Sequence, residues 1–160
     1  MPLSQEFVGR HYRYPDYYLV EREKKIREHA RAIQNDDPAF FSDEAAAELG
    51  YDAVLAPLTF TSMLGYAAQM AFFDDADIGI SDKQIVQVDQ VLKFLKPIQA
   101  GDKLFCDVYV HDIRQAHGTD IIVTKNVVSN QDDEVVQETY TTLAGRSEED
   151  GESGFNDGTA

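Results

Sequence analysis

The sequence predicts an α+β domain in which one antiparallel sheet wraps around a single long buried helix. Two observations predict it. Residues 59–73 form an apolar stretch of helical length, and the residues after it alternate between apolar and polar side chains over four separate runs. One sheet around one helix leaves an edge and an outer face exposed, so pairing with a second copy or with a related chain is expected.

The first half of the chain is predicted to be mainly helical. Residues 17–22 predict a short strand, and residues 23–34 predict a helix that ends before Pro38, because proline disfavours helix at the residue before it. Ser42 is the expected N-cap of a short helix over residues 43–49, with Gly50 as its C-terminal stop. The apolar side chains of residues 59–73 spread around much of the helix circumference, which predicts burial on most sides.

The second half is predicted to be a set of antiparallel strands. Turn residues separate the runs: Gly101-Asp102 follows the first, His117-Gly118 follows the second, and a polar hairpin at residues 130–133 follows the third. The strands are expected at residues 83–94, 103–113, 120–129 and 134–144.

Composition limits the class of protein. The chain has 160 residues and 43% hydrophobic residues, enough for one domain, which we assign to residues 1–146; the acidic, glycine-containing residues 147–160 predict a disordered tail. The net charge of −15 argues against nucleic acid and anionic membranes as partners. The single cysteine, Cys106, excludes an internal disulfide, and no Cys/His cluster has metal-ligand spacing. With no signal peptide or membrane span recognised, a cytoplasmic location is expected.

Several motifs together resemble one family. Residues 94–104 read FLKPIQAGDKL, residues 130–136 read NQDDEVV, and residues 34–40 read QNDDPAF. In this order and at these spacings they resemble MaoC-like (R)-specific hydratases and dehydratases, most closely the non-catalytic (HadA-like) subunit type of actinobacterial (3R)-hydroxyacyl-ACP dehydratases. The resemblance implies a hot-dog fold that pairs into a double hot dog, and no cofactor.

The resemblance also implies a chemistry that this chain lacks. The family removes water from a (3R)-hydroxyacyl thioester, and an Asp and a His five positions later share the acid and base work. These positions carry Asn35 and Phe40 here. Phenylalanine cannot transfer a proton, and a register slip that puts Asp36 in the Asp position puts Phe41 in the His position. We therefore expect no catalytic residue in this chain.

The sequence favours an accessory subunit. A sister chain with an intact motif would supply the Asp and His, while this chain would help to hold an acyl-ACP or acyl-CoA thioester during fatty-acid or mycolic-acid elongation. The residues expected to contact the substrate are Asn35, Asp36, Phe40, Phe60, Met63 and Leu64.

Two other functions remain open from the sequence. One is a non-catalytic hot-dog homodimer that binds acyl thioesters. The other is a homodimeric hydratase or thioesterase with an atypical site built on Asp36 or Asp37, although such a pair before a proline is more often a solvated turn. We expect surface or structural roles for the four histidines, which are His11, His29, His111 and His117. His29 is expected to be exposed.

Overall fold

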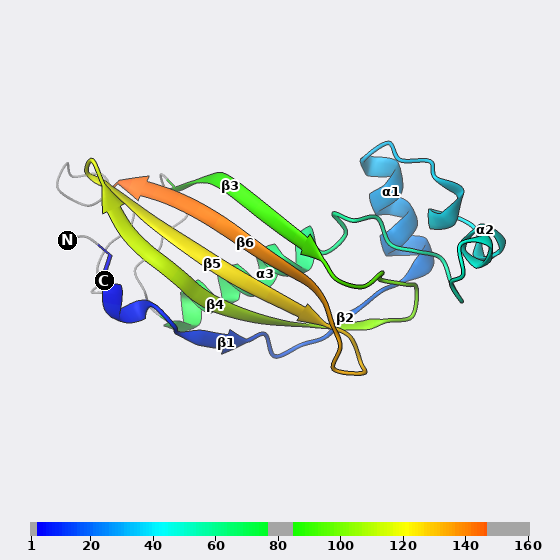
Figure 1. The fold of residues 1–160 in the computed structure, drawn as a ribbon, viewed down its shortest axis with the longest axis horizontal. Coiled ribbons are helices and arrows are strands. Elements are labelled where there is room, and N and C mark those ends of the chain that lie inside the picture. Colours follow the sequence, from blue (N-terminus) through cyan, green and yellow to red (C-terminus); the bar gives the residue numbers. More distant parts are fainter. Residues whose placement is uncertain (1–2, 77–84, 147–160) are drawn as a thin grey trace.

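The computed structural model describes residues 3–76 and 85–146. The predicted tail at residues 147–160 lies outside the described residues, as do the first two residues of the strand expected at 83–94. Within the described part, an antiparallel sheet is the main element (Figure 1).

The sheet has six strands in the order β1-β4-β5-β6-β3, and β2 pairs with β4 beside this path. The four long strands occur where the alternating pattern predicted them, and both hairpins fall at the predicted turns. The sequence analysis missed β1, and the strand that it predicted at residues 17–22 is only the two residues of β2. Strands this short are fixed by their pairing with β4 and carry little sequence pattern of their own. The strands are β1 (His11–Arg13), β2 (Tyr18–Leu19), β3 (Ile85–Phe94), β4 (Lys103–Ala116), β5 (Thr119–Ser129) and β6 (Val135–Arg146).

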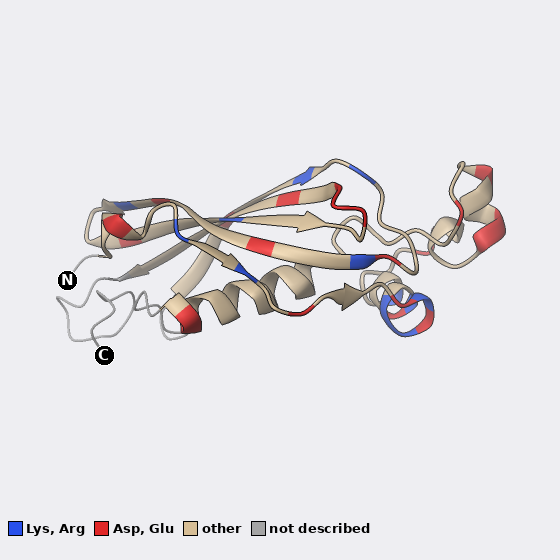
Figure 2. Ribbon diagram, turned by 90° about the horizontal axis from the view of Figure 1, so that it is seen from below, with Lys and Arg blue, Asp and Glu red and all other residues tan. Residues whose placement is uncertain are grey.

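The long helix α3 (Ser62–Ala76) crosses one face of the sheet, as Figures 1 and 2 both show. The sheet and this helix together give the α+β hot-dog arrangement that was expected. Residues 22–61, which we call the overhang, lie beyond one end of the sheet and carry most of the remaining helical turns. The short elements are η1 (Gln5–Phe7), η2 (a π-helix, Arg22–Arg27), α1 (Glu28–Ala32), η3 (Pro38–Phe40) and α2 (Asp43–Glu48).

Local signals placed the overhang elements well. The Ser42 hydroxyl accepts a hydrogen bond from the Ala45 amide at 3.3 Å and so caps α2, and Gly50 follows it with a φ of +89°. The helix predicted at residues 23–34 exists, but its first half is the π-helix η2. Lys and Arg residues are concentrated on this segment, as Figure 2 shows.

The prediction that the long helix is buried on most sides is wrong. Met63 and Tyr66 are 63% and 62% exposed. The buried stripe is Leu64, Ala68 and Phe72, which belong to the hydrophobic core. The apolar residues all round the helix therefore indicate a second apolar surface rather than burial within this chain.

The inner face of the sheet, which faces α3, has two chemically different parts. On β4, four fully buried apolar side chains alternate with outward residues; we call them the apolar strip: Leu104, Cys106, Val108 and Val110. In the middle of β5 and β6 the buried inward residues are polar; we call them the polar strip: Thr124, Asn126, Gln137, Thr139 and Thr141.

Strand β3 forms one end of the sheet and pairs only with β6 among the described strands. A bulge at Val88 adds one residue to β3, so that Gln87 lies opposite Leu143 and Gln90 lies opposite Thr141. Residues opposite one another in an antiparallel pair share a face, so the bulge places both glutamines on the inner face.

Candidate functional site

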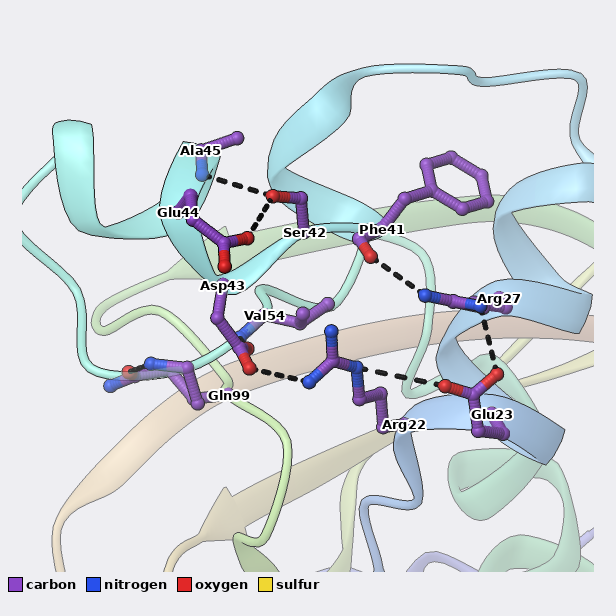
Figure 3. A network of polar contacts seen from close by, with 11 residues as sticks. Arg22, Glu23, Arg27, Phe41, Ser42, Asp43, Glu44, Ala45, Val54 and Gln99 are labelled. Atoms are coloured by element: carbon purple, nitrogen blue, oxygen red, sulfur yellow. Dashed lines mark hydrogen bonds and ion pairs between the residues drawn. The ribbon is translucent and has the colours of Figure 1, made fainter.

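A polar network joins the short elements of the overhang to one another (Figure 3). The Arg22 guanidinium forms an ion pair with Asp43, and the other oxygen of Asp43 accepts a hydrogen bond from the Val54 amide at 3.1 Å. Arg27 donates to the Phe41 carbonyl at 2.8 Å and pairs with Glu23 at 3.0 Å. These contacts fix the loop before α2, which carries the motif at residues 34–40, relative to η2.

The first part of this motif is a solvated turn. Asn35 and Asp36 are exposed, and the Asn35 side-chain oxygen accepts a hydrogen bond from the Asp37 amide at 3.2 Å. The Asp37 carboxylate accepts from the Ala39 amide at 3.0 Å and so caps η3. The two aspartates thus occupy turn positions, and the structure shows no contact between them that would make an acid and base pair.

Phe40, which the motif resemblance aligns with the family's histidine, lies in a largely apolar setting. Its half-buried ring packs against the core and lines a cavity of about 380 Å³ between the overhang and the end of β3. No histidine, aspartate or glutamate lines this cavity. The position therefore offers an apolar wall where the family motif would place a base. Neighbouring lining residues are Tyr51, Leu55, Leu58, Phe94 and Leu95, and the polar side chains of Lys96 and Gln137 also line the cavity.

The other residues predicted to contact substrate lie in different environments. Phe60 and Leu64 are 3% and 2% exposed and belong to the core, while Met63 is exposed on α3. The six predicted residues are therefore divided among an exposed turn, an apolar cavity, the core and an exposed helix face. Their role in binding substrate stays a prediction.

The histidines have structural contacts. The prediction that His29 is exposed is wrong: it is half-buried, because Nε2 lies 3.0 Å from the Thr59 hydroxyl and the ring packs edge-on to Phe60. Burial lowers the pKa of His29 below its ordinary value. His11 is exposed and lies 2.7 Å from Asp107, and His111 packs edge-on to a tyrosine. His117 occupies the turn before Gly118 with a φ of +51°.

The thiol and possible metal ligands give no reactive centre. Cys106 is buried in the apolar strip, and burial raises the pKa of its thiol to about 12, so the nucleophilic thiolate is scarce near neutral pH. In residues 3–76 and 85–146, no three His, Cys, Asp or Glu side chains gather in a way that could hold a metal ion. In the same residues, no helix is long and apolar enough to span a membrane.

A second cavity, which sequence reasoning missed, lies between α3 and the polar strip. Its volume is about 290 Å³, and it is lined from the helix side by Thr61, Gly65 and Gln69. The Thr124 hydroxyl donates to the Gln69 side-chain oxygen at 2.6 Å. The Asn126 amide nitrogen donates to the Gly65 carbonyl at 3.2 Å.

Gly65 permits this close approach. A Cβ at this position would lie 3.1 Å from the Asn126 amide nitrogen, tighter than most such contacts. Two sequence signals could have revealed the cavity. Small and polar residues recur at positions 61, 65 and 69, one face of a helix, and polar residues occupy alternate positions in the middle of β5 and β6. We call this space the polar cavity.

Comparisons with known proteins agree with this architecture. Residues 6–139 match a family model described as FAS1-like, dehydratase domain region. A UPF0336 protein of Mycobacterium tuberculosis (strain H37Rv) is 66% identical over 160 residues, the full length of both chains.

Two solved structures are also similar. One is a C-terminally truncated HadBC (3R-hydroxyacyl-ACP dehydratase) complex from Mycobacterium tuberculosis, with 50% identity, a TM-score of 0.79, and coverage of 87% of this chain and 97% of that chain. The other is a MaoC-like dehydratase with 38% identity, a TM-score of 0.80, and coverage of 88% of this chain and 42% of that chain.

Proposed function

The chain belongs to the FAS1-like dehydratase-domain family, with the hot-dog fold of MaoC-like dehydratases, and we propose that it is an accessory, substrate-binding subunit of a heterodimeric (3R)-hydroxyacyl-ACP dehydratase. In this proposal a sister hot-dog subunit with an intact motif supplies the catalytic Asp and His. The pair dehydrates a 3-hydroxyacyl thioester to a trans-2-enoyl thioester in the cytoplasm, during fatty-acid or mycolic-acid elongation.

The observation that carries the proposal is Phe40. The motif order places it at the histidine position, and no histidine, aspartate or glutamate lines its cavity; the Lys96 side chain that does line it forms an ion pair with Glu134. Asn35, at the aspartate position, is exposed and contacts the backbone of its own turn. A dehydratase needs a group that removes a proton beside the thioester carbonyl, and in this proposal that group comes from the sister.

Exposed apolar side chains support a partner on the β3 side. β3 is a ten-residue end strand whose Val86, Val88 and Val91 are about half exposed. The exposed face of α3, with Met63 and Tyr66, adds further apolar surface. Long apolar end strands are normally covered or paired, and the similar HadBC structure is described as a complex.

The test is hydration of a long trans-2-enoyl thioester by three preparations: this chain alone, a motif-intact hot-dog sister alone, and the two chains co-expressed and co-purified. We expect activity in the co-purified pair, and loss of that activity when the sister's motif His is replaced by Ala. Robust turnover by this chain alone would contradict the proposal and direct attention to Asp36, Asp37 and the histidines. A stable homodimer that gains nothing from any sister would support a binding protein instead.

The interface is tested by a matched pair of variants. Val86→Glu places a charge on β3, and Leu49→Glu places the same charge on an equally exposed residue at the end of α2; the exposed fractions are 59% and 60%. We expect Val86→Glu to reduce co-purification of the sister and Leu49→Glu to leave it unchanged. Equal effects of the two variants would place the partner elsewhere.

A further inference from the structure

The outer face of the sheet, which faces away from α3, carries apolar side chains on β5. Residues on this strand alternate between the two faces, and the inward ones include Thr124 and Asn126, which are buried and polar. The outward ones include Ile121, Val123 and Val127, which are half-buried. Antiparallel sheets with one solvated face normally show the reverse order, with apolar residues inside and polar residues outside. The outward residues of β5 therefore indicate a surface that another molecule covers.

The neighbouring strands extend this surface. Residues opposite one another in antiparallel strands share a face, so Tyr109 on β4 and Tyr140 on β6, which both lie opposite Lys125, also face outward. Among the described residues, no helix covers this face, because α3 crosses the other one (Figure 1). We call the five apolar and aromatic side chains the outer patch: Tyr109, Ile121, Val123, Val127 and Tyr140.

The rings of the outer patch are held in place within the chain. The Lys125 ammonium nitrogen lies 5.5 Å from the centre of the Tyr140 ring, and the His111 ring packs edge-on to the same ring, with centroids 5.1 Å apart. Tyr109 stacks on His11 with centroids 4.5 Å apart. Side chains that are already ordered lose little conformational entropy on binding, and aromatic anchors contribute strongly to protein–protein contacts.

The charges around the outer patch select its partner. The chain has a net charge of −15, so two copies repel one another through most of their surface. On the outer face, among the side chains that the structure describes, the two signs are nearly balanced: Arg13, Lys93, Lys103, Arg114 and Lys125 against Asp89, Asp107, Asp112 and Glu138. Two copies can therefore approach through this face without strong repulsion, and basic side chains of one can lie near acidic side chains of the other. A strongly acidic partner would meet the acidic side chains of the same face.

From these observations we infer that the outer patch is a contact surface between two copies of this chain, which pack with their sheets face to face. The contact is isologous, so the patch of one copy meets the same patch of the other. It differs from the surface proposed for the sister subunit, because β6 separates β5 from the end strand β3. The inference does not rest on the dehydratase activity.

The experiment is sedimentation velocity on the protein as purified, over concentrations from about 1 to 100 μM, since association depends on protomer concentration. The basic unit is the heterodimer where a sister co-purifies, and this chain alone where none does. We expect a species with twice the mass of the basic unit, and its share should rise with concentration. Val123→Glu places a charge in the centre of the contact and should weaken this association at least about tenfold. Leu49→Glu places the same charge on the overhang, at a residue 60% exposed, and should leave it unchanged.

A second variant separates association from folding. Val123→Thr keeps the shape and the β-branched side chain, so the strand should form as before and the melting temperature should stay close to that of the native chain. The added hydroxyl should still weaken the association, by less than the Val123→Glu change does. Neither variant should reduce co-purification of a sister, because β3 is unchanged.

Three outcomes would overturn the inference. The first is a single mass at every concentration, and the second is an equal effect of Val123→Glu and Leu49→Glu. The third is loss of the sister together with the doubled species in Val123→Glu, which would place the outer patch in the heterodimer contact instead. A pair that lacks dehydratase activity but still doubles through Val123 would retain this inference and remove the proposed function.

Discussion

The apolar strip and the polar strip lie on the same face of one sheet, yet they do different work. The apolar strip on β4 packs against the buried stripe of α3, and its four side chains are at most 1% exposed. The polar strip on β5 and β6 is nearly as buried, but it borders a cavity instead of the helix core. Depth of burial alone therefore does not distinguish a surface packed against the helix from a surface that borders a cavity; the fit of the opposite side chains does.

Burying polar side chains beside a cavity sacrifices packing. A threonine or asparagine in the wall removes less apolar area from water than a leucine would, and it needs partners for its polar atoms. The Thr124–Gln69 hydrogen bond satisfies one such pair, and the Asn126 oxygen remains unsatisfied. The polar strip is therefore a place where the fold keeps a cavity at some cost in stability.

The largest expected difference between the strips is the loss in free energy of unfolding when one of their side chains is changed. Leu104→Ala leaves a cavity in the apolar strip and should lower the free energy of unfolding by about 2–5 kcal/mol. Thr141→Val in the polar strip keeps the shape and adds a methyl group, and it should change stability by less than about 1 kcal/mol. Urea denaturation of both variants measures the difference. Equal losses would mean that the two strips contribute alike to stability.

A smaller effect is expected inside the polar strip itself. Thr124→Val leaves the Gln69 oxygen without its donor and should cost about 1–3 kcal/mol. The double variant Thr124→Val with Gln69→Leu removes both partners and should recover part of that loss. A double-mutant cycle by denaturant unfolding gives the coupling energy. Strict additivity would show that this hydrogen bond contributes nothing of its own.

The smallest effect is a pH dependence at the end of β5. Burial raises the pKa of the Asp120 carboxyl, although the Leu3 amide donates to it at 3.2 Å. A raised pKa in the folded state means that the carboxyl favours folding when protonated and loses this contribution as pH rises through the folded pKa. Asp120→Asn should therefore gain in melting temperature relative to the native chain between about pH 4 and 7, and match it near pH 3. A constant difference across this range would rule out the titration of Asp120 as its source.

Much of the fold could be read from local pattern. The alternation of apolar residues located β3 to β6, and the Ser42 cap and Gly50 located α2, because these signals depend on neighbours in the sequence. Phe40 and Asn35 could also be assigned from the motif order alone. Their surroundings, an apolar cavity and an exposed turn, needed the folded chain.

Tertiary structure alone decided the remaining features. The bulge at Val88 sets which glutamines of β3 face inward, and the position of α3 over β4 leaves space beside β5 and β6. It also leaves Met63 and Tyr66 exposed, where the sequence suggested burial. The sequence by itself determined the four long strands, the main helices and their order. From the motif order it also predicted Asn35 and Phe40 at the catalytic Asp and His positions. Which faces meet, and where a cavity remains between them, depends on contacts between residues far apart in the chain, which no local pattern records.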